Sequence, residues 1–145
     1  MKTLENFQFP VVTNKYRGTP TYFRVLAELV RAAEYHGVTT YQDVAVIMGI
    51  PLQGGFMAGE TGHILGEISE DEARAGRPML SALAVSVVSG KAGSGFFGLA
   101  KDLKKFSGDP ADEDRFWRAE LDAVYETWKR PCISREANKI SRGIL

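Results

Sequence analysis

The sequence predicts a mostly helical α+β fold in a single domain. Four stretches carry apolar residues at the three- and four-residue spacing of amphipathic helices, and glycine or proline residues separate them. Residues 79–88 are apolar at nearly every position, which is typical of a strand buried on both faces. The chain has 145 residues, of which 44% are apolar and 25% are charged, as in soluble globular domains. We therefore expect one globular domain over residues 1–130 and a basic tail over residues 131–145.

The first helix is predicted over residues 20–36. Thr19 suits the N-cap position because its side-chain oxygen can accept a backbone N–H, and Pro20 suits the first helical position. Gly37 should end this helix in the left-handed conformation. The apolar stripe that we expect to face the core comprises Tyr22, Val25, Leu26, Leu29, Val30 and Ala33.

The next part of the chain predicts a short helix, a loop and a longer helix. Thr40 can cap the short helix, and Asp43 follows three residues later, where a carboxylate favours the positive end of the helix dipole. Gly49 should stop that helix. The glycine-rich residues 54–59 then form a loop, and an amphipathic helix covers about residues 60–75.

The last third of the chain predicts a strand followed by two helices. The strand over residues 79–88 leads into a glycine-rich loop at residues 89–95 and a short helix over residues 96–106. A long amphipathic helix over residues 111–129 has acidic residues in its first turn and basic residues at its end, as the helix dipole favours. The apolar stripe of this long helix, which we assign to the core, comprises Phe116, Trp117, Leu121, Val124, Tyr125 and Trp128.

Three short segments carry a family resemblance. Residues 40–45 read Thr-Tyr-Gln-Asp-Val-Ala, residues 62–66 read Gly-His-Ile-Leu-Gly, and residues 78–82 read Pro-Met-Leu-Ser-Ala. In this order, over roughly residues 38–95, they resemble the winged-helix DNA-binding domain of the methylguanine-DNA methyltransferase and alkyltransferase-like families. The resemblance implies a winged-helix-like core and a role in nucleic-acid-associated complexes.

The sequence differs from these families at the position of their reactive residue. Met79 stands where the family has a reactive Cys or a Trp, and a thioether cannot form a thiolate nucleophile. Leu80 and Ser81 replace the His and Arg that follow in the family. The resemblance therefore implies a non-enzymatic binding module without alkyl transfer. Cys132, the only cysteine, cannot form an internal disulfide, and together with the absence of a signal-peptide pattern it favours the cytoplasm.

Charge is distributed unevenly along a chain whose formal net charge is zero. Residues 1–31 sum to +3, residues 32–73 to −7 and residues 74–145 to +4. The acidic middle would repel the phosphates of DNA, so an alternative function is a protein-interaction or inhibitor protein that binds a basic partner. The acidic face predicted for that partner comprises Asp43, Glu60, Glu67, Glu70, Asp71 and Glu72. Phe56 and Met57 could add an apolar patch, although we assign both to the core.

The glycine-rich loop suggests a third function, the binding of a nucleotide or phosphate. Residues 93–98 satisfy the pattern G-x-G-x-x-G between a predicted strand and a predicted helix, but no acidic strand end follows as in a dinucleotide fold. Free N–H groups at the start of that helix could still hold an anion. The residues that we assign to a nucleic-acid or anion site are Ser89, Lys91, Gly93, Ser94, Gly95, Lys101, Lys104 and Lys105. In the tail, Arg135, Lys139 and Arg142 could assist.

Metal and catalytic sites are not predicted. Glu60, His63 and Glu67 share one helix face, but His36 is the only other histidine, so a second half of a metal site is missing. We therefore expect no cofactor, no membrane span and no catalytic residue. The preferred hypothesis is a non-enzymatic binding module of winged-helix character, with the acidic-face and phosphate-binding alternatives left open.

Overall fold

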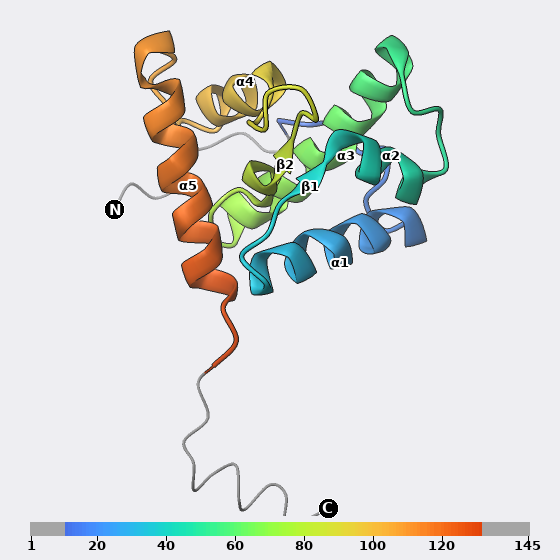
Figure 1. Cartoon of the computed structure of the whole chain (residues 1–145), viewed down its shortest axis with the longest axis horizontal. Coiled ribbons are helices and arrows are strands. Elements are labelled where there is room, and N and C mark those ends of the chain that lie inside the picture. The colour runs from blue at the N-terminus through green and yellow to red at the C-terminus, as the bar shows by residue number, and fades with distance from the viewer. Residues whose placement is uncertain (1–10, 132–145) are drawn as a thin grey trace, which may run out of the picture.

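The computed structural model describes residues 11–131 (Figure 1). Its helices and its single pair of short strands confirm the mostly helical α+β class. The helices are α1 (Pro20–Glu34), α2 (Tyr41–Met48), α3 (Gly54–Arg74), α4 (Ser94–Asp102) and α5 (Glu113–Trp128). Short 3-10 turns cover Leu80–Leu83 and Pro110–Asp112, and the strands are β1 (Thr39–Thr40) and β2 (Ala84–Val85). Cys132 and the basic tail residues Arg135, Lys139 and Arg142 lie outside the described residues.

Local capping signals predicted the first two helices well. The Thr19 side chain accepts the N–H of Tyr22, which confirms the start of α1. Thr40 and Asp43 form a reciprocal capping box at α2, because each side chain accepts the backbone N–H of the other residue. The end of α1 differs from the prediction, since His36 rather than Gly37 takes the left-handed conformation, with φ 55°.

Helix α3 begins six residues earlier than predicted. The loop expected at residues 54–59 is the first part of the helix, so that prediction is wrong. Glycine disfavours a helix in isolation, yet these residues are helical although only Met57 among residues 54–59 is partly buried. Inside this first part, the Thr61 hydroxyl donates to the carbonyl oxygen of Met57 at 2.7 Å and ties two successive turns together.

The strand predicted over residues 79–88 is also mostly wrong. Leu80–Leu83 forms a 3-10 turn, and only Ala84–Val85 pairs in a sheet, parallel to Thr39–Thr40. Side chains of α5 satisfy backbone groups of this segment: Glu120 accepts the N–H of Met79, and the indole N–H of Trp117 donates to the oxygen of Ala82. Residues 79–85 are buried throughout, whereas Val87 and Val88 are exposed. The mostly apolar residues 79–85 therefore reflect burial and not strand geometry.

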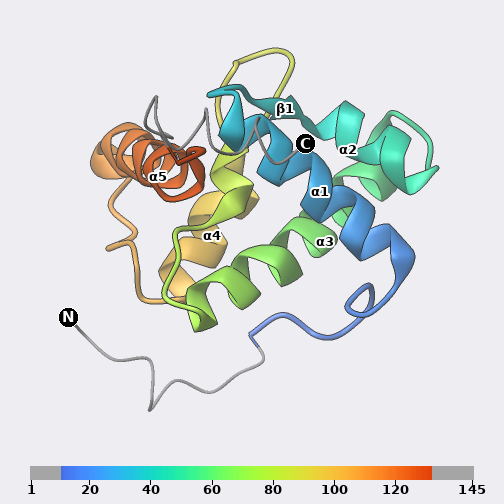
Figure 2. The ribbon, with the colours of Figure 1, turned by 90° about the horizontal axis from the view of Figure 1, so that it is seen from below.

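This buried segment is the centre of the core. Helices α1, α3 and α5 pack around Leu80–Leu83, and α5 runs along one side of the molecule (Figures 1 and 2). Trp117 and Val124 of α5 are buried, which confirms that part of the aromatic stripe is core. Helix α4 starts two residues before the predicted position and ends four residues earlier, where Lys104 takes a positive φ of 61°. Its Phe96 ring packs against Phe116 of α5.

Candidate functional site

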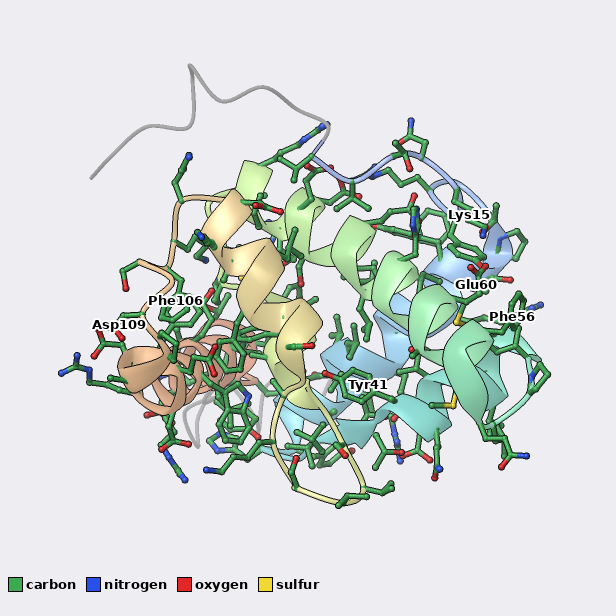
Figure 3. The ribbon with its side chains drawn as sticks, turned by 90° about the horizontal axis from the view of Figure 1, so that it is seen from above. Lys15, Tyr41, Phe56, Glu60, Phe106 and Asp109 are labelled. Carbon is green, nitrogen blue, oxygen red and sulfur yellow. The ribbon has the colours of Figure 1, made fainter. Side chains whose placement is uncertain are left out.

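A cavity of about 740 Å³ lies between α3 and α4. Figure 3 shows these two helices side by side, with Tyr41 at the end of the space between them where α4 begins. The cavity is lined by Val11, Val12, Tyr41, Met57, Ala58, Gly59, Thr61, Gly62, Leu65, Gly66, Ser81, Gly93, Ser94, Gly95, Phe96, Gly98, Leu99 and Asp102. Most of these residues are apolar or glycine, and none is Lys or Arg. The size and the lining are those of a small-molecule site.

Helical glycines make up much of the cavity wall. A Cβ atom added at Gly62 of α3 or at Gly98 of α4 would meet no heavy atom within 4 Å. By contrast, a Cβ at Gly66 would approach a methyl group of Val12 at 3.3 Å. Glycine inside a helix costs about 0.5–1 kcal/mol relative to alanine. Packing explains that cost at Gly66, whereas no neighbouring atom would exclude a side chain at Gly62 or Gly98, which are exposed and line the cavity.

Hydrogen-bond donors gather where α4 begins. The N–H of Gly93 donates to the Tyr41 hydroxyl oxygen at 2.7 Å. Burial raises the pKa of Tyr41, so this hydroxyl stays protonated at neutral pH, and its proton has no acceptor among residues 11–131. No side chain caps α4, and the N–H groups of Ser94 and Gly95 lie in its first turn, where a helix has no acceptors of its own. This end of the cavity therefore offers donors to a ligand.

A pair of serines lies deeper in the cavity wall. Ser81 is 5% exposed, and its hydroxyl is hydrogen-bonded to the hydroxyl of Ser69 at 2.7 Å. The Ser69 oxygen also accepts the N–H of Ser81 at 3.0 Å. The two side chains therefore satisfy each other within the described part of the chain.

The structure separates the residues that the sequence assigned to one anion site. Gly93, Ser94 and Gly95 line the cavity as expected of a ligand-binding loop, whereas Ser89 is exposed outside it. The ammonium of Lys91 is bound to Asp114 at 2.9 Å, away from the cavity lining. The remaining members of the predicted site lie at the opposite, C-terminal end of α4. Lys101 is in the last turn of the helix, and Lys104 and Lys105 follow it.

Three of the six residues predicted to form an acidic face are buried, namely Glu67, Glu70 and Glu72. Glu67 and Glu70 are 0% exposed, and Glu72 is 5% exposed, so the expectation that these carboxylates face a partner is wrong. Glu72 forms an ion pair with Arg77 at 2.7 Å. Asp71 is half-buried and accepts the Tyr22 hydroxyl at 2.5 Å. A carboxylate that satisfies internal hydrogen-bond donors is unavailable to a basic protein.

Glu67 and Glu70 hold the N-terminal segment, residues 11–18, against α3. Glu67 accepts the backbone N–H groups of Lys15 at 2.9 Å, Tyr16 at 3.0 Å and Arg17 at 3.1 Å. Figure 2 shows this segment running beside α3 on its way to α1. Because its first residues line the cavity, the buried carboxylates also position one cavity wall.

Arg17 supplies the positive charge for this arrangement. Its guanidinium donates to Glu70 at 2.5 Å and to Asp71 at 3.1 Å. The pKa of Arg17 is raised by its hydrogen bonds to Asp71 and Glu70, which outweigh the opposing effect of burial. The sequence offered no indication of this pairing, because Arg17 lies 53 residues from Glu70.

Of the predicted acidic face, Asp43 is exposed, and Glu60 and Asp71 are partly buried. Asp43 caps α2. Glu60 pairs with Lys15 and accepts the Tyr16 hydroxyl, and these bonds hold its pKa below the usual range. His63 points a ring nitrogen at the oxygen of Thr13, 2.8 Å away. Among residues 11–131, no cluster of three or more His, Cys, Asp or Glu could hold a metal ion.

Phe56 and Met57 differ from each other. Phe56 is 61% exposed, so its assignment to the core is wrong. Figure 3 shows Phe56 at the edge of the molecule near the start of α3. Met57 is partly buried and lines the cavity. The cavity members that sequence reasoning missed include Tyr41 and Ser81, which share no local pattern because two different elements carry them.

Alkaline pH should destabilise the protein through its buried tyrosines. Burial, together with the hydrogen bond to Glu60, raises the pKa of Tyr16 to about 12, and burial with the bond to Asp71 raises the pKa of Tyr22 further. A phenol whose pKa is raised on folding stabilises the fold below its unfolded pKa of about 10, and this contribution is lost as the pH rises through 12. Urea unfolding at about pH 8 and pH 11 should show the loss, with Tyr16→Phe reducing it. A pH-independent free energy of unfolding would contradict this assignment.

None of the described helices is long and apolar enough to cross a membrane. Comparison of the chain with protein-family models, with curated proteins and with solved structures finds no match.

Proposed function

We propose that this chain is a non-enzymatic binding protein whose cavity between α3 and α4 takes a small, mostly apolar molecule. The observation that carries the proposal is the glycine-lined wall. Gly62 and Gly98 line the cavity although glycine weakens a helix, and a Cβ added at either position would meet no heavy atom within 4 Å. This proposal retains a ligand role for residues 93–95 and replaces the nucleotide or phosphate with a less charged ligand.

The lining supports an apolar ligand body. Leu65 of α3, Phe96 and Leu99 of α4 and Val12 of the N-terminal segment present apolar side chains to the space. Transfer of apolar surface from water into such a site contributes roughly 25 cal/mol for each Å² buried. The cavity volume of about 740 Å³ falls within the range of sites for drug-sized ligands.

A cavity-filling variant tests this function. Gly98→Leu places a branched side chain where the added Cβ meets no neighbour, so α4 should stay folded while the cavity loses volume. With decanol as a neutral apolar probe, we expect the melting temperature of the wild type to rise with probe concentration, and that of Gly98→Leu to stay constant.

Gly55→Leu is the matched control for that experiment. Gly55 is also a helical glycine with open space at its Cβ position, but it does not line the cavity. Gly55→Leu should therefore respond to decanol as the wild type does. An equal response of all three proteins would show that the probe binds elsewhere, and no response in the wild type would reject the proposal.

A second candidate function keeps the winged-helix module that contacts nucleic acid. The observation that favours it is the internal position of Glu67 and Glu70, because their charges no longer face a DNA backbone. Helices α2 and α3 also follow each other in the order that the family resemblance implies. Binding of a labelled duplex at low salt, falling steeply as salt is added, would support this candidate. No binding at low salt would reject it.

A further inference from the structure

We propose that the N-terminal segment, residues 11–18, is a hinged wall of the cavity, which opens to admit the ligand and closes once the ligand is bound. This inference rests on the proposed function and adds the route by which the ligand enters. Three features carry it: the place of the segment at the cavity, the polar character of its attachment to α3, and the glycine at its junction with α1.

The segment forms the cavity wall at a point where α3 and α4 approach each other. Val11 and Val12 both line the cavity. A Cβ atom at Gly66 of α3 would lie 3.3 Å from a methyl group of Val12 and 3.9 Å from a methyl group of Leu99 of α4. Val12 and Leu99 therefore adjoin the same point of α3. Moving the segment away would remove this part of the wall and widen the access to the cavity.

The attachment of the segment to α3 is polar. None of residues 11–18 is buried, and within residues 11–131 no backbone-to-backbone hydrogen bond joins the segment to α3. Instead, Glu67 accepts the three successive N–H groups of residues 15–17. Glu70 accepts the N–H groups of residues 11 and 12. Release of the segment therefore exposes little apolar surface, so the hydrophobic effect opposes it only weakly.

Hydration of the buried charges offsets part of the cost of opening. Glu67 and Glu70 are 0% exposed, and the Arg17 guanidinium pairs with Glu70 at 2.5 Å. Enclosing these charges removes water from them, and they regain that water when the segment moves away. The released N–H groups also bond to water. Opening is thus a local event that requires less free energy than unfolding of the domain.

Gly18 supplies the hinge. Its φ is 79°, in the left-handed region that glycine enters without strain, and a Cβ there would meet no heavy atom within 4 Å. The next residue, Thr19, caps α1 by accepting the N–H of Tyr22. A backbone rotation at Gly18 would therefore swing the segment and leave α1 in place, with loss of the bonds that Thr19 donates to the oxygen of Tyr16.

A reversible cross-link between the segment and α3 tests the proposal. Val12→Cys with Gly66→Cys introduces two thiols where a Val12 methyl group lies 3.3 Å from the Cβ position of Gly66, which brings the pair within reach of a disulfide. Cys132→Ser removes the native cysteine, so that the introduced pair provides the only thiols of the chain. Oxidation locks the segment and dithiothreitol releases it, so the reduced protein is the matched control.

The rate at which decanol associates with these proteins would be measured by NMR line-shape analysis. We expect the oxidised protein to bind decanol at least about ten-fold more slowly than the same protein after reduction, because entry needs a motion that the disulfide prevents. Gly66→Cys with Cys132→Ser, which lacks the second thiol, should show the same rate with and without the oxidant.

Amide hydrogen exchange measures the opening in the wild type. The five N–H groups bonded to Glu67 and Glu70 should exchange together, and faster than the amides of Ile64 and Ile68 on the buried face of α3. Decanol at about ten times its dissociation constant should slow the exchange of these five groups about ten-fold, because it binds the closed form.

The alternative outcomes are distinct. Equal rates of decanol association before and after reduction would overturn the hinged wall and leave the proposed function standing. Exchange of the five N–H groups only as slowly as Ile64 and Ile68 would also overturn it, because the segment would then open only when the domain unfolds. No binding of decanol to the wild type would reject the proposed function together with this entry route. The exchange measurement needs no substitution, so it decides the question even if the cross-linked variant fails to fold.

Discussion

Glu70→Ala is expected to lower the free energy of unfolding by about 3 kcal/mol, because it removes one partner of a buried ion pair. The Glu70 carboxylate is fully buried, pairs with Arg17 at 2.5 Å and accepts the backbone N–H groups of Val11 and Val12. Alanine would leave the two amides without their acceptor and would remove one of the two carboxylates to which the guanidinium donates. Since a domain is stable by only about 5–15 kcal/mol, a loss of this size is large. Urea unfolding followed by tryptophan fluorescence measures it.

Glu60→Ala is the control for Glu70→Ala. Both glutamates lie on α3 and both contact the N-terminal segment, but Glu60 keeps 16% of its side chain exposed and pairs with the half-exposed Lys15, whereas Glu70 is fully buried. Exposed ion pairs contribute little to stability, so Glu60→Ala should change the urea midpoint only slightly. If the two variants were equally stable, the N-terminal segment would not depend on its buried carboxylate, and our account of α3 would be wrong.

Combining Gly62→Ala with Gly98→Ala should raise the free energy of unfolding by about 1–2 kcal/mol. Each substitution removes the entropy cost of a helical glycine, about 0.5–1 kcal/mol, and each added methyl group enters open space. The two sites lie on different helices, so their effects should nearly add. The same variant should bind decanol more weakly, because both positions line the cavity. Thermal unfolding and probe titration measure the two effects.

Gly66→Ala should behave differently from those two substitutions. Its Cβ would lie 3.3 Å from a methyl group of Val12, so the helix gains stability only if the N-terminal segment shifts. We therefore expect no stabilisation, or a loss, at this position. A gain at Gly66 equal to that at Gly62 would show that the cavity wall is more adaptable than the structure indicates.

The elements that could be predicted from sequence are those with local physical causes. The starts of α1 and α2 depend on Thr19 and Thr40, whose side chains bond backbone groups within three residues. The burial of Trp117 and Val124 follows from a helical periodicity within α5. In each case the interacting groups are close in sequence, so a short window of residues contains the whole interaction.

The predictions that failed concern burial and long-range partners. Residues 79–88 were apolar enough for a buried strand, but hydropathy cannot distinguish a strand from a buried 3-10 turn. The glycines of residues 54–59 disfavour a helix locally, yet these residues form the first turns of α3. In the buried segment, partners distant in sequence bond the backbone, namely Glu120 at Met79 and Trp117 at Ala82.

The candidate site shows the same division. The glycine-rich loop at residues 93–95 was a candidate from its pattern, and it does line a cavity. The other wall of the cavity, on α3, and the donor Tyr41 could be identified only from the folded structure. The acidic set was misplaced because formal charge does not show burial: Glu67 and Glu70 are satisfied by backbone groups 50 to 59 residues away.

The sequence by itself determined the helical class, the caps of α1 and α2, the core face of α5 and the glycine-rich turn at α4. Tertiary structure alone decided which carboxylates are buried, where the cavity lies and which glycines border it. The physical reason is the distance along the sequence over which each kind of interaction acts. Capping and helical periodicity act over a few residues, whereas an ion pair such as Arg17 with Glu70 and a cavity between two helices exist only after the whole chain has folded.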